Sequence, residues 1–235
     1  MTRAAIAVDA PLTRDAAVSI AEAGGNAVDI TVAAALTATL SETLMCSLGG
    51  SGFLMVQRGG QPPELIEGAD VVPSGDPARA EVWEIALPYG DGITLRAGPG
   101  SVAVPGLLAC LHRAWTRHGS LPWRELVQPA LEVARRGWSV GVTTARWLKI
   151  AGVPLLARQQ ASRKCFLAAG QRPLRAGERL HFPGMVDTLE LVARQGAAAL
   201  YGGDLGAAWA ETMAACGGLV TLADLARYRA VVRPS

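Results

Sequence analysis

A run of small residues at positions 47–52, SLGGSG, is the first stretch of this sequence whose residue types could take part in chemistry. A P-loop would open a helix and carry a lysine after its last glycine, whereas here the strand-like residues 53–56, FLMV, follow. A nucleophile elbow would also need a helix after the serine, and the glycine after Ser51 comes one residue too early. The glycines are therefore expected to allow close backbone packing, and the exposed amides of the loop could form a nest for an anion.

A second candidate nucleophile is Thr2, because removal of Met1 would leave a threonine whose own amine could act as the base. Such a threonine must be followed by a strand in a specific sheet, and threonine at position 2 is common. The sequence therefore favours an ordinary residue here, and we select neither Ser51 nor Thr2 as a nucleophile.

The histidines and cysteines do not form a recognisable catalytic or metal-binding pattern. There is no CxxC pair, no histidine at ligand spacing and no histidine paired with a nearby serine or cysteine, so neither a zinc site nor a disulfide framework is predicted. His118 precedes Gly119 at a predicted helix end, where a cationic side chain complements the helix dipole. The cysteines, which we expect to be reduced and mostly buried, are Cys46, Cys110, Cys165 and Cys216.

Two helices and a hairpin are expected to position the glycine-rich loop. Thr13 is predicted to cap a helix that runs to Ala23 and ends at a glycine pair, and Asn26 to cap an alanine-rich helix that runs to about Leu40 and is buried against a sheet. The loop then leads into a hairpin formed by residues 53–56 and 64–66. Residues 70–100, rich in Pro, Gly and Asp, are predicted to form an irregular surface connection that could line a site.

The second half of the sequence is predicted to be mainly helical, with a strand over residues 229–234 that needs a neighbour. A helix ending at Gly137 should be interrupted by Pro129. The remaining helices are expected over residues 105–117, 123–136, 143–150, 185–195, 204–216 and 222–228.

Composition limits the classes of function. The chain has 235 residues, of which half are hydrophobic, and a formal net charge of only +2, so it is expected to fold as a single domain over 1–235 without the basic surface of a nucleic-acid-binding protein. The apolar run at 30–40 is shorter than the roughly 20 residues of a membrane span. The start has too short an apolar run for a signal peptide, so we expect a cytoplasmic protein with no membrane partner.

Several segments together resemble the gamma-glutamyltransferase family. Residues 24–29, GGNAVD, with the alanine-rich helix after them are similar to its GGNAvDAavA signature, and residues 48–53, LGGSGF, are similar to its LGGGGF loop. The match continues in order along almost the whole chain, in residues 98–106 (GPGSVAVPG), 119–123 (GSLPW), 129–130, 134–137, 201–203 (YGG) and 217–228 (GGLVTLADLARY).

The resemblance implies an α/β (α+β) fold, in which this chain provides a helical layer and a few strands of an αββα N-terminal-nucleophile (Ntn) hydrolase sandwich. It implies a precursor that cleaves itself into large and small subunits. The new N-terminal threonine of the small subunit attacks a gamma-glutamyl amide, and the acyl group passes to water or an amine, without metal or cofactor. We expect this chain to be the large-subunit part and that threonine to lie outside it.

Two departures from the family concern substrate binding. An arginine in the family's RE.AP motif, just after the hairpin, holds the α-carboxylate of the donor, and here Ala69 and Asp70 stand at the arginine and glutamate positions. Because an alanine cannot make that charge-assisted pair, a standard gamma-glutamyl donor is not expected. Residues 43–47, TLMCS, replace a proline and a glycine of the family, so Met45 and Cys46 could reshape the pocket floor or be neutral packing changes.

These observations give two hypotheses. The first is the large-subunit part of a divergent acyltransferase or amidohydrolase, with small-molecule acyl donors and acceptors and a threonine-bearing small subunit as partners. Its substrate-binding candidates are Ala69, Asp70, Gly49, Gly50 and Ser51. The second hypothesis is a non-catalytic binding or scaffold remnant of the same fold.

Overall fold

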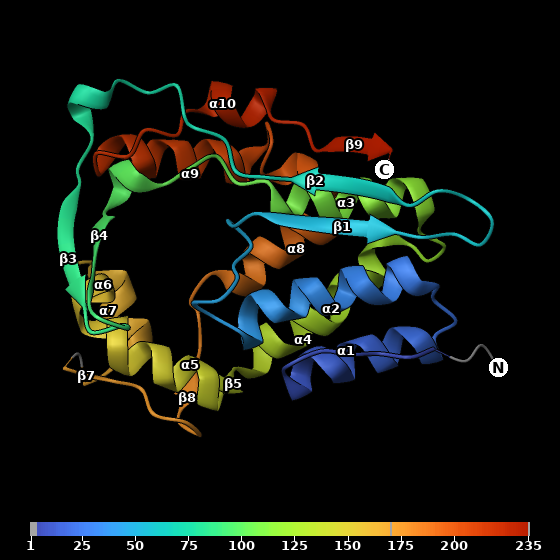
Figure 1. Ribbon diagram of the computed structural model, residues 1–235, viewed down its shortest axis with the longest axis horizontal. Helices are drawn as coiled ribbons and strands as arrows, with labels where there is room; N and C mark the ends of the chain where they lie inside the picture. The colour runs from blue at the N-terminus through green and yellow to red at the C-terminus, as the bar shows by residue number, and fades with distance from the viewer. Residues whose placement is uncertain (1–3, 170, 235) are drawn as a thin grey trace.

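The computed structural model describes residues 4–169 and 171–234, so Thr2 lies outside the described residues. Helices α1 (Pro11–Glu22), α2 (Ala27–Ser41), α3 (Leu107–His118) and α4 (Trp123–Arg136) form one body with a three-stranded antiparallel sheet (Figure 1). A second, smaller part, which contains β3, β4, α6 and α7, lies to the left in the same view.

Helix α1 begins at Pro11, two residues before the predicted cap Thr13, because proline has a φ angle that suits the first helical position. The prediction that Thr13 caps this helix was wrong. Its hydroxyl is buried and lies 2.9 Å from Ser41 Oγ and 2.9 Å from the Glu42 carboxylate, so it joins α1 to the end of α2. The helix ends before Gly24, whose φ of 87° is the predicted left-handed stop.

Helix α2 starts at the predicted cap. The Asn26 side chain accepts hydrogen bonds from the backbone N–H groups of Val28 and Asp29, and Asp29 accepts one from Asn26 N in return. Asp29 is fully buried, and it also accepts hydrogen bonds from Ser120 N and Leu121 N, which join α2 to the loop between α3 and α4. The main neighbours of α2 are the helices α1, α4 and α3. The prediction that α2 is buried against a sheet was therefore wrong, because the helix that packs against the sheet is α3.

The sheet has the strand order β1 (Gly52–Val56), β2 (Glu64–Gly68) and β9 (Val231–Pro234), which confirms the predicted hairpin and the predicted strand near residue 230. Leu54, Ile66 and Val232 form one row across the three strands, on the face that packs against the helices. The other face carries Phe53 and Met55, which are 63% and 64% exposed.

Residues 70–100 are more ordered than expected. They contain a 3-10 turn (Pro77–Arg79), a hairpin of β3 (Trp83–Leu87) and β4 (Ile93–Ala97), and a second 3-10 turn (Pro99–Ser101). The prediction of an irregular connection was wrong because alternate residues of β3 are buried. Ile85 and Leu87 pack with Ala97 and Ala151 in a small core that is separate from the main one.

Helix α4 runs without a break through Pro129, contrary to the predicted interruption. Apolar residues on both sides of this proline are buried, including Leu126 and Ala130, and their packing against α2 and α8 outweighs the loss of one backbone hydrogen bond.

The other elements are β5 (Trp138–Ser139), α5 (Val142–Trp147), a π-helical turn (Leu148–Gly152), α6 (Val153–Leu156), α7 (Gln160–Phe166), β6 (Leu167–Ala168), β7 (Arg172–Pro173), β8 (Arg179–Leu180), α8 (Met185–Gln195), a 3-10 turn (Gly196–Ala199), α9 (Asp204–Ala215) and α10 (Leu222–Arg227).

Candidate functional site

The β1–β2 hairpin brings the predicted substrate-binding residues to one place. Gly52 and Gly68 are direct partners in the antiparallel ladder, at the end opposite the hairpin turn. Ser51 precedes Gly52 and Ala69 follows Gly68, so the two predicted segments leave the sheet side by side. Residues separated by about twenty positions in the sequence thus form one surface at the open end of the hairpin.

The glycine-rich loop is held against the start of α3. The Gly50 carbonyl accepts hydrogen bonds from Gly106 N at 2.9 Å and Leu107 N at 3.0 Å, and Gly50 N donates to Ser47 O at 3.0 Å. Because the Gly50 N–H group is used within the loop, an anion-binding nest would rely on the amides of Gly49 and Ser51. Both of these residues are exposed.

The segment after β2 is fixed through its backbone while the side chains of residues 70–72 remain exposed. Tyr228 Oη donates to Ala69 O at 2.6 Å, Val71 exchanges two hydrogen bonds with Val104, and Ser74 N donates to Asp224 at 3.1 Å. Asp70 is exposed, and Val72 is 87% exposed. The structure therefore presents the exposed side chains of residues 70–72 on a fixed backbone.

Two tyrosines support this surface from inside the protein. The rings of Tyr201 and Tyr228 are stacked with centroids 5.3 Å apart, and Tyr201 Oη donates to Pro105 O at 2.8 Å. Burial raises the pKa of Tyr228 to about 12, so its hydroxyl stays protonated and can donate to Ala69 at any working pH. Neither tyrosine was selected as a site residue from the sequence, although both lie in segments that resemble the family.

At position 69 the structure places a half-buried alanine, so no guanidinium can extend from this point. A cation does lie near the other end of the segment. Arg227 Nη2 is 3.4 Å from Ser74 Oγ and 3.2 Å from the Asp224 carboxylate, with which it forms an ion pair. A donor carboxylate near residue 69 would therefore lack the direct bidentate partner that an arginine supplies there.

The histidines do not supply a general base to this surface. His112 is packed against Trp115 and Trp123, and burial lowers its pKa. His118 lies in the last turn of α3, as predicted, and its Nε2 lies 2.8 Å from Glu64 Oε1 at the opposite end of β2. His181 is exposed. Among the residues that the structure describes, no three His, Cys, Asp or Glu side chains are grouped to hold a metal ion.

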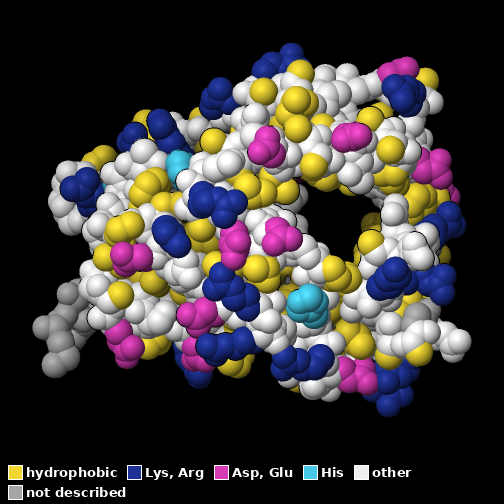
Figure 2. Space-filling view, turned by 180° about the vertical axis from the view of Figure 1, so that it is seen from behind, with side chains coloured by type: hydrophobic (Ala, Val, Ile, Leu, Met, Phe, Trp, Pro, Cys, Tyr) yellow, Lys and Arg dark blue, Asp and Glu magenta, His cyan; other side chains and the backbone are white. Residues whose placement is uncertain are grey.

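The molecule is open beside the candidate surface. Figure 2 shows a passage through the protein with hydrophobic side chains on much of its rim. In Figure 1 the corresponding gap lies between the β3–β4 hairpin and the segments that precede β1 and follow β2. A substrate or a further polypeptide could therefore reach the open end of the hairpin.

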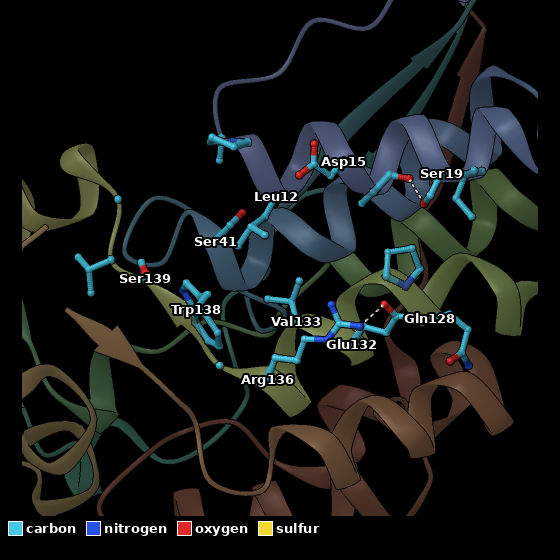
Figure 3. Close-up of a pocket in the computed structure, with 18 of the residues that line it drawn as sticks. Leu12, Asp15, Ser19, Ser41, Gln128, Glu132, Val133, Arg136, Trp138 and Ser139 are labelled. Atoms are coloured by element: carbon cyan, nitrogen blue, oxygen red, sulfur yellow. Dashed lines mark hydrogen bonds and ion pairs between the residues drawn. The ribbon is translucent and has the colours of Figure 1, made fainter. Parts of the chain in front are cut away.

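A separate cavity of about 890 Å³ lies between α1 and α4, away from this surface (Figure 3). It is lined by Leu12, Asp15 and Ser19 of α1 and by Glu132 and Arg136 of α4, among others, and by none of the five predicted substrate-binding residues. Glu132 and Arg136 are paired with each other at 3.5 Å. Its polar groups do not converge on one point, so we do not place the chemistry here.

The fold and the position of these segments define the class of the protein. A helical layer under antiparallel strands, with a glycine-rich loop at the open end of a hairpin, is the large-subunit portion of the Ntn-hydrolase fold found in its solved structural neighbours. One of these is the gamma-glutamyltranspeptidase from Pseudomonas nitroreducens complexed with L-DON, which superimposes with a TM-score of 0.83 at 26% identity, over 99% of this chain and 67% of that chain.

The family model of gamma-glutamyltranspeptidase matches residues 13–235, and the chain belongs to this family. Among curated relatives, glutathione hydrolase proenzyme 2 of Schizosaccharomyces pombe is 29% identical over 97% of this chain and 36% of its own length. The acylase ACY 1 proenzyme of Pseudomonas sp. (strain SE83) is 34% identical over 99% of this chain and 42% of its own length. The chain thus spans about two fifths of the curated relatives that it matches.

Within the part of the chain that the structure describes, the helices are too short or too polar to cross a membrane.

Proposed function

We propose that this chain is the large-subunit part of an acyltransferase or amidohydrolase whose nucleophile is the N-terminal threonine of a small subunit. The observation that carries the proposal is the pairing of Gly52 with Gly68 at the open end of the β1–β2 hairpin, directly after residues 49–51 and directly before residues 69–70. The sequence motifs at this surface resemble the family's donor-binding motifs, and the ends of β1 and β2 that carry them border the gap beside the β3–β4 hairpin (Figure 1).

The reaction that we propose is acyl transfer in two steps. The threonine hydroxyl attacks the amide carbonyl of the donor, and its own α-amine takes the hydroxyl proton and then gives it to the leaving amine. The acyl-enzyme is next attacked by water or by a second amine, which releases an acid or a new amide. This chain contributes by orienting the donor, through the glycine-rich loop and the segment that begins at Ala69.

We further propose that the preferred donor has no free α-carboxylate beside its acyl chain. Ala69 offers no charge to such a group, and the exposed side chain closest to it in sequence is the acidic Asp70, which would repel a carboxylate. The exposed Val72 adds apolar surface to the same segment.

The outer face of the sheet supports the proposed partner. Phe53 and Met55 of β1 and Val231 of β9 are exposed on this face, which is an unusual arrangement for a surface that meets only water. We propose that the threonine-bearing small subunit covers it. A cytoplasmic location is also proposed, because all four cysteines are free and a reducing compartment would keep them so.

Expression of the chain with the threonine-bearing polypeptide tests the proposal. We expect no turnover of a gamma-glutamyl anilide by residues 1–235 alone and turnover of an acyl amide by the complete assembly. Replacement of the small-subunit threonine by alanine should abolish that turnover. Activity of residues 1–235 alone would contradict the proposal; if it disappeared in Thr2→Ala, Thr2 would be the nucleophile. An assembly that is inactive on every amide would favour the scaffold remnant.

A further inference from the structure

The backbone of the segment that begins at Ala69 is fixed at four points by residues that belong to other elements. Ala69 O and Ser74 N are bonded to side chains, and Val71 and Gly75 are bonded to backbone groups of Val104 and Leu219. The segment has no helix of its own and takes part in no strand beyond the single bridge at Val71. Its shape is therefore set from outside, and the two side-chain contacts can be tested separately.

Both side-chain contacts come from α10 and its C-terminal cap. Asp224 and Tyr228 are four positions apart, so they lie on the same side of one helical turn. Asp224 accepts from Ser74 N at 3.1 Å, and Tyr228 Oη donates to Ala69 O at 2.6 Å. A single turn of helix thus holds the two ends of a segment of six residues.

Asp224 is itself held in place. It is buried, and its Oδ2 atom also accepts from Thr221 N at 3.0 Å and from Thr221 Oγ1 at 2.8 Å, which completes the capping box of α10. Although burial opposes ionisation, the hydrogen bonds from Ser74 and Thr221 lower the pKa of Asp224 below its usual range. The carboxylate is therefore an ionised acceptor at neutral pH.

Tyr228 is also held in place by its neighbours. Its ring stacks on Tyr201, and its hydroxyl reaches Ala69 only because residues 68 and 106 are glycines. A Cβ atom on Gly106 would overlap Tyr228 Oη, and one on Gly68 would lie 2.5 Å from the carbonyl oxygen of Gly106. The contact therefore depends on three residues from three separate parts of the sequence.

We propose that Asp224 and Tyr228 are positioning residues for the acyl donor. They hold the backbone of residues 69–74 so that Ala69 and the exposed side chains of residues 70–72 are presented to the donor. This inference rests on the proposed function. It assigns a role to α10, and it predicts that loss of either contact raises the KM for the donor with little change in kcat.

The test compares Tyr228→Phe with wild type in the complete assembly. This variant removes one hydroxyl and keeps the stacked ring, and Tyr89→Phe, on an exposed tyrosine of the β3–β4 turn, is the matched control. We expect a rise in donor KM of about three- to tenfold for Tyr228→Phe, the effect of one lost hydrogen bond, and none for Tyr89→Phe. Asp224→Ala should show a larger rise than Asp224→Asn, because asparagine retains an acceptor.

Hydrogen exchange of the same variants separates the inference from the proposed function. Faster exchange at Val71 and Gly75 in Tyr228→Phe, with an unchanged unfolding temperature, would show local release of the segment. Release together with raised KM supports the inference. Release with unchanged KM, or a fall in kcat alone, would overturn it. A wild-type assembly that is inactive on all amides would overturn the proposed function, whatever the exchange rates show.

Discussion

Gly106 lies directly against the hydroxyl of Tyr228, at the point where the start of α3 meets the segment after β2. Its φ of −123° is one that alanine adopts without strain, so a substitution here adds only a steric clash. We expect Gly106→Ala to lower the free energy of unfolding by about 1–3 kcal/mol, the usual range for overpacking. Urea denaturation measures this.

Gly59→Ala is the control for that change, because a Cβ at position 59 meets no atom within 4 Å. Its stability should stay within about 0.5 kcal/mol of wild type. An equal loss in both variants would mean that the close approach of Gly106 and Tyr228 is not what constrains position 106.

The contacts of Glu64 with Arg117 and His118 predict a loss of stability in acid. The hydrogen bonds from Arg117 and then from His118 lower the pKa of Glu64 to about 2. Because the folded pKa is below the unfolded one, this pair stabilises the protein above the unfolded pKa, and the contribution is lost as the pH falls toward 2.

We therefore expect the stability of Glu64→Gln to vary less than that of wild type between about pH 5 and pH 2. Thermal unfolding across this range is the measurement. Glu211→Gln, at an exposed position of α9, is the control and should follow the wild-type curve. A Glu64→Gln curve parallel to wild type would show that this ion pair does not contribute.

The exposed face of the sheet predicts self-association of the isolated chain. Phe53 and Met55 lie on β1, at the edge of the sheet, where unpaired backbone groups accompany an apolar surface. Light scattering should detect oligomers of residues 1–235, and the double substitution Phe53→Ser with Met55→Ser should reduce them. Val142→Ser, on a valine of α5 that is even more exposed, is the control. A stable monomer of the wild-type chain that binds no hydrophobic dye would contradict this prediction.

Position 69 offers a gain-of-function prediction. In the complete assembly, Ala69→Arg should raise kcat/KM for glutathione relative to a simple acyl amide by about tenfold or more, because a charge-assisted pair contributes roughly 1.5–3 kcal/mol. Ala69→Met has similar length without charge and should not produce this change. If wild type already prefers glutathione, another residue must bind the carboxylate, and Arg227 is the first to examine.

Local signals in the sequence predicted much of the fold. The glycine pair and Asn26 gave the boundary between α1 and α2, and α8 has the predicted bounds. The β3–β4 hairpin was missed because only alternate residues of one short strand are buried, and their partner Ala151 lies more than sixty positions away. Thr13 was misread as a cap because its real partner, Ser41, lies 28 positions away.

In the candidate site, too, some residues could be selected from the sequence, whereas the contacts between distant residues could not be predicted. Ala69 and the glycines of the loop could be selected from the sequence by their resemblance to a family motif. Asp224 and Tyr228 also lie in a segment that resembles the family, but their role was not predicted, because they bond backbone atoms 150 and 159 positions away and no local pattern reveals such a contact.

The third strand of the sheet also has a consequence for the order of folding. Arg233 of β9 pairs with Glu67 of β2 across 166 positions, whereas α1 and α2 are neighbours in sequence. On a ribosome that adds about 5–20 residues per second, β9 is synthesised roughly ten to thirty seconds after β2. Through that interval its edge is open and the segment after Ala69 lacks both of its side-chain contacts. Among the residues that the structure describes, the surface that we assign to the donor is therefore completed only after β9 has been synthesised.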